Sequence, residues 1–119
     1  VLQIHTMSGL RKHEGYNGVV AQTGEREITM MVDSRLGEGD LIQCVAHEMV
    51  HVKQYVKREL SYNERKKVSR YKGQVYKEAN MNYWDMPWEI EAFRREGELA
   101  LALVESVAQK KKNKKLIYI

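Results

Sequence analysis

The sequence predicts a small α+β domain in which a sheet of about three strands packs on two helices. Its 119 residues are enough for one hydrophobic core. Three short strand-like runs lie before residue 34, and two longer segments with helical periodicity follow them. We therefore expect a single domain over residues 1–108 and a basic C-terminal tail over residues 109–119.

The three strand-like runs are rich in β-branched and other apolar residues. They cover residues 1–7, 19–23 and 27–33. A connection rich in glycine and charge joins the first two runs. Residues 23–26 (Thr-Gly-Glu-Arg) are the predicted hairpin turn between the last two.

The first helix is predicted over residues 40–58. Asp40 and Gln43 resemble a capping box at its start. One face of this helix is apolar and carries Leu41, Ile42, Val45, Met49, Val52 and Val56. A separate stripe carries His47, His51 and Gln54, with Glu48 and Cys44 between that stripe and the apolar face. We therefore expect a helix with one buried face and a distinct functional edge.

The functional edge contains an H-E-x-x-H motif, His47-Glu48-Met49-Val50-His51. Residues four apart lie on the same side of a helix, so both imidazoles can reach one metal ion. The glutamate beside the first histidine can then take a proton from a water bound to that metal. A buried histidine without a metal is the ordinary interpretation of either residue alone, but the pair at this spacing favours a metal site.

The segment after the first helix carries weaker signals. Residues 60–72 are polar and charged, and we expect them to form the end of the helix and a solvated connection. Gly73 is expected to loosen the chain before a short strand or hairpin at residues 74–76. Residues 80–85 are predicted to form a loop, and Pro87 suits the first turn of a second helix that ends near Ala108.

A catalytic zinc usually has three protein ligands, and His51 is the last histidine of the chain. The acids around the second helix are therefore the candidates for the third ligand: Asp85, Glu89, Glu91, Glu96 and Glu98. The apolar stripe of this helix carries Ile90, Phe93, Gly97, Leu101 and Val104. Glu89 and Glu96 flank the stripe on one side, whereas Glu91 lies on the other. Glu89 also lies in the first turn, where the helix dipole favours a carboxylate. We expect Glu89 to be the ligand, with Glu91 as its rival and Glu96 supporting the ligands from outside.

The motif followed by Glu89-Ile90-Glu91-Ala92 resembles the gluzincins, zinc peptidases with H-E-x-x-H and a downstream E-x-x-A on a second helix. The small size is also similar to that of minimal single-domain zincins and SprT-like peptidases. The resemblance implies a zincin-like fold and one Zn²⁺ held by His47, His51 and Glu89. It also implies that Glu48 is the general base in the hydrolysis of peptide bonds. Many gluzincins have an acid four residues after the ligand glutamate, where this chain has Phe93.

Further expectations follow for a protein or peptide substrate. In zincin-like folds the substrate pairs with the edge strand of the sheet, and residues 27–33 are the candidate edge. The candidates for stabilising the oxyanion are Tyr76, Tyr83, Arg94 and Arg95, and the sequence does not rank them. We expect Trp84 and Trp88 to anchor the second helix against the core rather than to contact substrate.

The chain has no apolar run as long as a membrane span and no signal-peptide pattern. Its single cysteine, Cys44, excludes an internal disulfide, fits a reducing compartment and is expected to be a quiet buried thiol. We therefore expect a cytoplasmic protein without a membrane partner.

The net charge of +4 belongs to the tail. Without the five tail lysines the chain has 15 basic and 16 acidic residues. These lysines are Lys110, Lys111, Lys112, Lys114 and Lys115. They are suited to weak contacts with nucleic-acid phosphates, although a solvated, disordered terminus is the simpler expectation. The alternative to an enzyme is a non-catalytic zincin-like module with structural zinc, tethered to nucleic acid or a protein partner by this tail.

Overall fold

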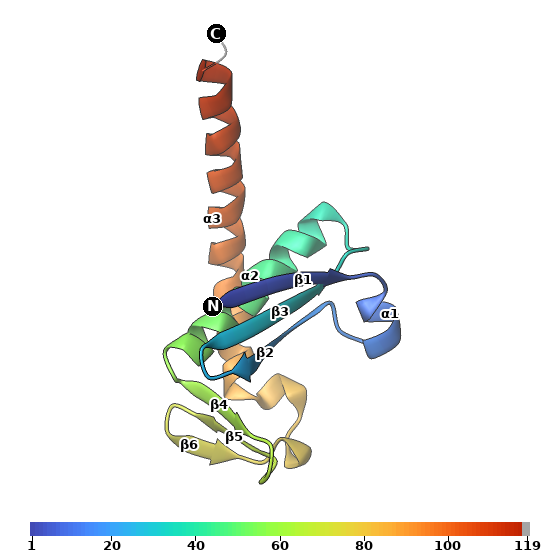
Figure 1. Ribbon diagram of the computed structural model, residues 1–119, viewed down its shortest axis with the longest axis vertical. Coiled ribbons are helices and arrows are strands. Elements are labelled where there is room, and N and C mark those ends of the chain that lie inside the picture. The colour runs from blue at the N-terminus through green and yellow to red at the C-terminus, as the bar shows by residue number, and fades with distance from the viewer. Residues whose placement is uncertain (118–119) are drawn as a thin grey trace.

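The computed structural model describes the backbone of residues 1–117 and the side chains of residues 1–112. The chain forms an α+β fold, as predicted, but with two small sheets rather than one (Figure 1). The elements in order are β1 (Leu2–Met7), α1 (Leu10–Glu14), β2 (Gly18–Gly24), β3 (Glu27–Asp33), α2 (Glu38–Val56), β4 (Leu60–Asn63), β5 (Val68–Tyr71), β6 (Gln74–Tyr76), the 3₁₀ turns η1 (Glu78–Asn80) and η2 (Tyr83–Asp85), and α3 (Pro87–Ile117).

The first sheet has the strand order β1-β3-β2. β3 pairs in parallel with β1 and antiparallel with β2, so β3 is the central strand. The expectation that residues 27–33 form an edge was therefore wrong. β2 is the edge strand that contacts α2 and faces the functional helix.

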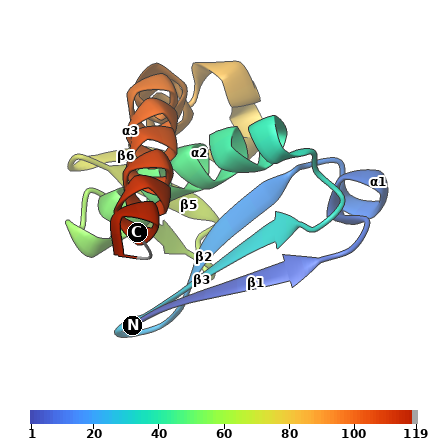
Figure 2. The same ribbon diagram turned by 90° about the horizontal axis from the view of Figure 1, so that it is seen from above.

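The main core lies between this sheet and α2. Buried apolar side chains of the sheet, among them Met30 and Val32, pack with Cys44 and Val52 of the helix. Figure 2 shows the first sheet on one side of α2 and α3 on the other, and α2 contacts both. Because α2 is covered on two sides, the polar edge with His47, His51 and Gln54 is buried, whereas most of the predicted apolar face is only half-buried.

Helix α2 differs from the prediction at both ends. It begins at Glu38 after Gly37, with no side-chain cap, so the Asp40–Gln43 capping box does not form. Glu38 and Asp40 instead place negative charge in the first turn, which the helix dipole favours. The helix ends at Val56, which is 65% exposed although it belonged to the predicted apolar face.

A second sheet forms where a solvated connection was expected. β4, β5 and β6 pair antiparallel in that order, and only the short strand at residues 74–76 was anticipated. Lys72 and Gly73 connect β5 to β6 with positive φ at both positions, which is the geometry of a two-residue type I′ hairpin. Leu60 and Tyr71 of this sheet form a small core with Trp88.

Helix α3 begins at Pro87, as predicted, but continues to Ile117 instead of ending near Ala108. The basic segment at residues 109–117 is therefore helical and not a disordered tail; Lys110–Lys112 are exposed, and the side chains of Lys114 and Lys115 lie outside the described residues. Its C-terminal half projects away from the rest of the molecule (Figure 1). No helix in the described part of the chain is long and apolar enough to cross a membrane.

The face of α3 that packs on the domain was also predicted wrongly. Ile90 and Phe93 of the expected apolar stripe are exposed, whereas Trp88, Glu91 and Ala92 are buried. Ala92 is fully covered, and its small side chain allows the first turns of α3 to lie close to α2. This contact brings the acids of α3 to the histidines of α2.

Candidate metal centre

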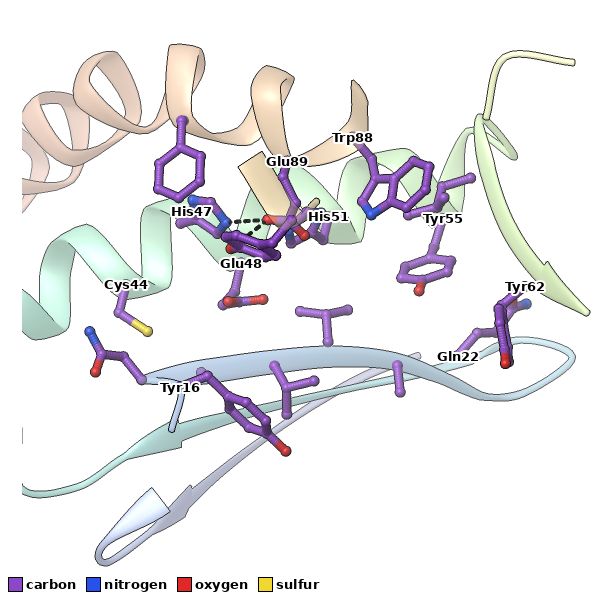
Figure 3. A pocket seen from close by; sticks show the side chains of 18 of the residues that line it. Tyr16, Gln22, Cys44, His47, Glu48, His51, Tyr55, Tyr62, Trp88 and Glu89 are labelled. Carbon is purple, nitrogen blue, oxygen red and sulfur yellow. Dashed lines mark hydrogen bonds and ion pairs between the residues drawn. The ribbon is translucent and has the colours of Figure 1, made fainter. Parts of the chain in front are cut away.

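Three potential ligand atoms converge between α2 and α3. His47 and His51 lie one turn apart on α2, and Glu89 lies in the first turn of α3 (Figure 3). The Oε1 atom of Glu89 is 2.9 Å from His47 Nε2 and 3.1 Å from His51 Nε2. One atom from each side chain lies within 4.8 Å of the other two, so the cluster could hold a metal ion. Two imidazole nitrogens and one carboxylate are a donor set that suits a catalytic zinc.

The second ring nitrogen of each histidine also has a partner. His47 Nδ1 lies 2.8 Å from Glu96 Oε2, and His51 Nδ1 lies 2.8 Å from Gln54 Oε1. Both partners are oxygen acceptors, so in each ring Nδ1–H donates and Nε2 is left for the cluster. The structure thus places Glu96 outside the cluster, against one of its histidines.

Glu91, the rival candidate, points to a different set of partners. Its carboxylate, 2% exposed, accepts hydrogen bonds from Gln54, Tyr71 and Lys53. Burial alone would raise the pKa of Glu91, but these hydrogen bonds, beginning with that from Gln54, lower it to about 2. Glu91 is not a member of the cluster.

The protonation of the cluster follows from its geometry. Burial alone would lower the pKa of His47 and His51, but the Glu89 carboxylate raises both above 6.5. Burial alone would raise the pKa of Glu89, but hydrogen bonds from the two histidines lower it to about 2. These shifts favour protonated histidines around the ionised Glu89 carboxylate, and a divalent metal ion could replace the protons that lie between them.

Glu48 lies beside the cluster and lines the same cavity. Its side chain extends from α2 toward β2 (Figure 3). Burial raises the pKa of Glu48 above its ordinary value of 4.5, and the nearby histidines oppose that rise. A carboxylate with a raised pKa is a stronger base than an ordinary glutamate.

The cavity is a cleft of about 1390 Å³ that the cluster opens into. Strand β2 forms one wall and α2 and the start of α3 form the opposite wall (Figure 3). Tyr62 on β4 lies toward the far end of this cleft, so the second sheet also contributes to its lining.

An aromatic group borders the cleft next to His47. Phe93 packs edge-on against His47 with ring centroids 4.6 Å apart, and Trp84 lies 5.2 Å from Phe93. Tyr83 contacts both Trp84 and Phe93. Trp88 is 4% exposed and anchors α3 as predicted, but Trp84 is 66% exposed and does not.

The four candidates for stabilising the oxyanion lie in different places in the structure. Tyr83 lines the cleft, and its hydroxyl donates to Glu89 Oε1 over 3.0 Å. Tyr76 packs on Trp88, and Arg95 pairs with Glu91. Arg94 is exposed on α3. Tyr83 alone among these four belongs to the lining of the cleft.

Sequence reasoning missed two contributions to the site. Gln54 was noticed on the histidine stripe but was given no role, although its position three residues after His51 was the available signal. Tyr71 was also missed, because it lies in a strand of the second sheet where a solvated connection was expected. Cys44 is a buried thiol, as expected, and burial followed by the charge of Glu48 raises its pKa to about 11.

No protein-family model, curated protein or solved structure matches this chain. The function of the site is therefore inferred from its residues and their geometry.

Proposed function

We propose that this protein is a zinc-dependent peptidase. The observation that carries the proposal is the convergence of His47 Nε2, His51 Nε2 and Glu89 Oε1 in a cleft that Glu48 also lines. Three ligands and an open cleft favour a catalytic site, because structural zinc sites usually have four protein ligands. The rival interpretation as a module with structural zinc requires a fourth ligand, and no fourth residue joins the cluster among the described residues.

The bound zinc would supply a Lewis acid for the scissile carbonyl and would acidify a water molecule. Glu48 accepts the proton of that water and passes it to the nitrogen of the leaving amine. The raised pKa of Glu48 suits both transfers. The Tyr83 hydroxyl donates to Glu89 at the cluster and is the proposed donor to the developing oxyanion.

The substrate we propose is an extended segment of polypeptide. β2 is an edge strand along the cleft, so its free main-chain groups can pair with such a segment. The exposed aromatic group of Tyr83, Trp84 and Phe93 then offers a surface for an apolar side chain next to the scissile bond.

Zinc binding by ligand variants tests the proposal. Wild-type protein should bind one zinc per chain and cleave casein, and Glu89→Ala should lose most of both. Glu98→Ala is the matched control, because Glu98 is an exposed acid on the same helix. Zinc retained in Glu89→Ala but lost in Glu91→Ala would show that Glu91, not Glu89, is the third ligand. Wild-type protein that takes up no zinc would refute the proposal.

A further inference from the structure

Gln54 is a fully buried amide next to a proposed metal ligand. Its side chain is 0% exposed, and each of its polar atoms has a partner. Oε1 lies 2.8 Å from His51 Nδ1, while Nε2 donates to the Trp88 carbonyl over 3.0 Å and to Glu91 Oε1 over 2.8 Å.

These partners determine which way the amide faces. A main-chain carbonyl and a carboxylate only accept hydrogen bonds, so the NH₂ group of Gln54 must face Trp88 and Glu91. The amide oxygen is then left for His51, whose Nδ1 must carry a hydrogen. His51 Nε2 is the nitrogen that remains for a metal, and it faces Glu89.

Glu91 is itself fixed from three elements. Lys53 of α2 donates to Oε2 over 2.9 Å, Arg95 of α3 pairs with the same atom at 3.2 Å, and Tyr71 of β5 donates to Oε1 over 3.1 Å. The carboxylate thus cannot turn away from Gln54 without losing several buried contacts. A continuous chain of hydrogen bonds runs from the second sheet through Glu91 and Gln54 to His51.

We propose that Gln54 is a positioning residue for the metal ligand His51, and that Glu91 fixes the direction of the Gln54 amide. This inference rests on the proposed zinc site. It gives Glu91, the rival ligand on sequence grounds, a different role, which it exerts through Gln54. Groups that orient a metal-bound histidine typically change metal affinity by 10–100-fold when removed.

The test measures zinc affinity by competition with a chromophoric chelator. Gln54→Leu keeps the side-chain volume but removes the acceptor for His51 Nδ1–H, and should weaken zinc binding by about 10–100-fold. It should also change the visible spectrum of the Co²⁺-loaded protein. Val52→Ala is the matched control, because Val52 is buried on the same helix in the main core. It should lower thermal stability without weakening zinc binding.

A reversed pair provides the rescue. Gln54→Glu combined with Glu91→Gln keeps an oxygen acceptor for His51 and places a donor amide at position 91, but it removes the donor to the Trp88 carbonyl, so it should recover only part of the affinity that Gln54→Leu loses. Folded Gln54→Leu that binds zinc as tightly as wild type would overturn the inference, as would equal weakening by Val52→Ala. If Gln54→Leu does not fold, Gln54→Met replaces it, and folded Gln54→Met that binds zinc as tightly as wild type overturns the inference.

The same samples separate this inference from the proposed function. Wild-type protein that binds zinc but cleaves no peptide would refute the proposed peptidase activity. The zinc affinities of the variants would then still decide the role of Gln54. An active wild type with an unaffected Gln54→Leu would refute only the role of Gln54. Wild-type protein that binds no zinc would overturn both.

Discussion

Gly18 lies at the start of β2, close to the functional helix α2. A Cβ atom at this position would lie 2.7 Å from Cys44 Sγ, 3.1 Å from the Met31 carbonyl oxygen and 3.2 Å from Glu48 Cγ. The first of these distances is shorter than ordinary contacts between such atoms. The absence of a side chain at Gly18 therefore allows the edge strand to lie beside the proposed general base.

We predict that Gly18→Ala lowers the free energy of unfolding by about 1–3 kcal/mol, because it overpacks the contact with Cys44. Adding Cys44→Ala should recover part of this loss. Urea denaturation of the two single variants and the double variant measures the effect. Gly39→Ala in the first turn of α2 is the control, because a Cβ there has no neighbour within 4 Å. A Gly18→Ala protein as stable as wild type would contradict this account of the contact.

The lowered pKa of Glu91 leads to a prediction about how the stability of the metal-free protein depends on pH. Its pKa falls from 4.5 to about 2 on folding, so it stabilises the fold above pH 4.5 and this stability is lost as the pH falls toward 2. Glu91→Gln should therefore lower stability at pH 7 by about 1–3 kcal/mol and flatten the acid part of the curve. Thermal melts from pH 2 to 7 measure this, with Glu98→Gln as the control. Parallel curves for wild type and Glu91→Gln would refute the assignment.

At the scale of single residues, the sequence predicted the members of the cluster better than their surroundings. The proximity of His47 and His51 follows from helical spacing alone. Glu89 was selected relative to an apolar stripe that proved to be exposed, and its position in the first turn was the sounder argument. Gln54 could not be assigned, because its role depends on Glu91 and on the Trp88 carbonyl, both more than thirty residues away.

At the scale of elements, the strands of the first sheet were predicted but their order was not. The hairpin of β2 and β3 leaves open which of the two strands pairs with β1. The structure pairs β1 with β3, and this choice leaves β2 free along the cleft. Alternation of apolar and polar residues locates a strand but does not determine its neighbours.

The second sheet was missed because its strands are short and mostly polar. One side chain of β4, Leu60, and one large side chain of β5, Tyr71, reach its small core. The Lys72–Gly73 turn was the usable signal, since glycine at the second position of a two-residue loop is typical of a hairpin. The end of α3 was also missed. The helix continues through the lysines because lysine favours helix and this run contains no residue that breaks one.

The aromatic group on η2 and α3 leads to a prediction about substrate preference. Trp84 is exposed at the cleft and is not a member of the metal cluster, so Trp84→Ala should leave zinc affinity unchanged. It should lower kcat/KM by about 10-fold or more for peptides with a large apolar residue next to the scissile bond, and much less for alanine at that position.

Paired synthetic peptides that differ only at this residue measure the preference. Val75→Ala is the control, because Val75 is an exposed apolar residue of β6 that does not line the cleft. The same loss for both peptides would show that Trp84 does not contact that side chain.

At the scale of the whole molecule, the candidate site forms where three parts meet. The first sheet contributes the edge strand, α2 and α3 contribute the cluster, and the second sheet contributes Tyr71 behind Glu91 and one end of the cleft. The fold class could be predicted because it depends on local periodicity. The cleft could not, since its shape depends on contacts between segments that are distant in the sequence.

Peptide cleavage by zinc-loaded wild-type protein and Glu48→Gln, followed by mass spectrometry, tests the central claim most directly. The variant removes the proposed base and leaves His47, His51 and Glu89 in place, so it should retain one zinc per chain. Its cleavage rate should fall by at least about 100-fold, the usual effect of losing a general base. Equal cleavage by the variant, or none by zinc-loaded wild type, would contradict the proposal that this protein is a zinc peptidase.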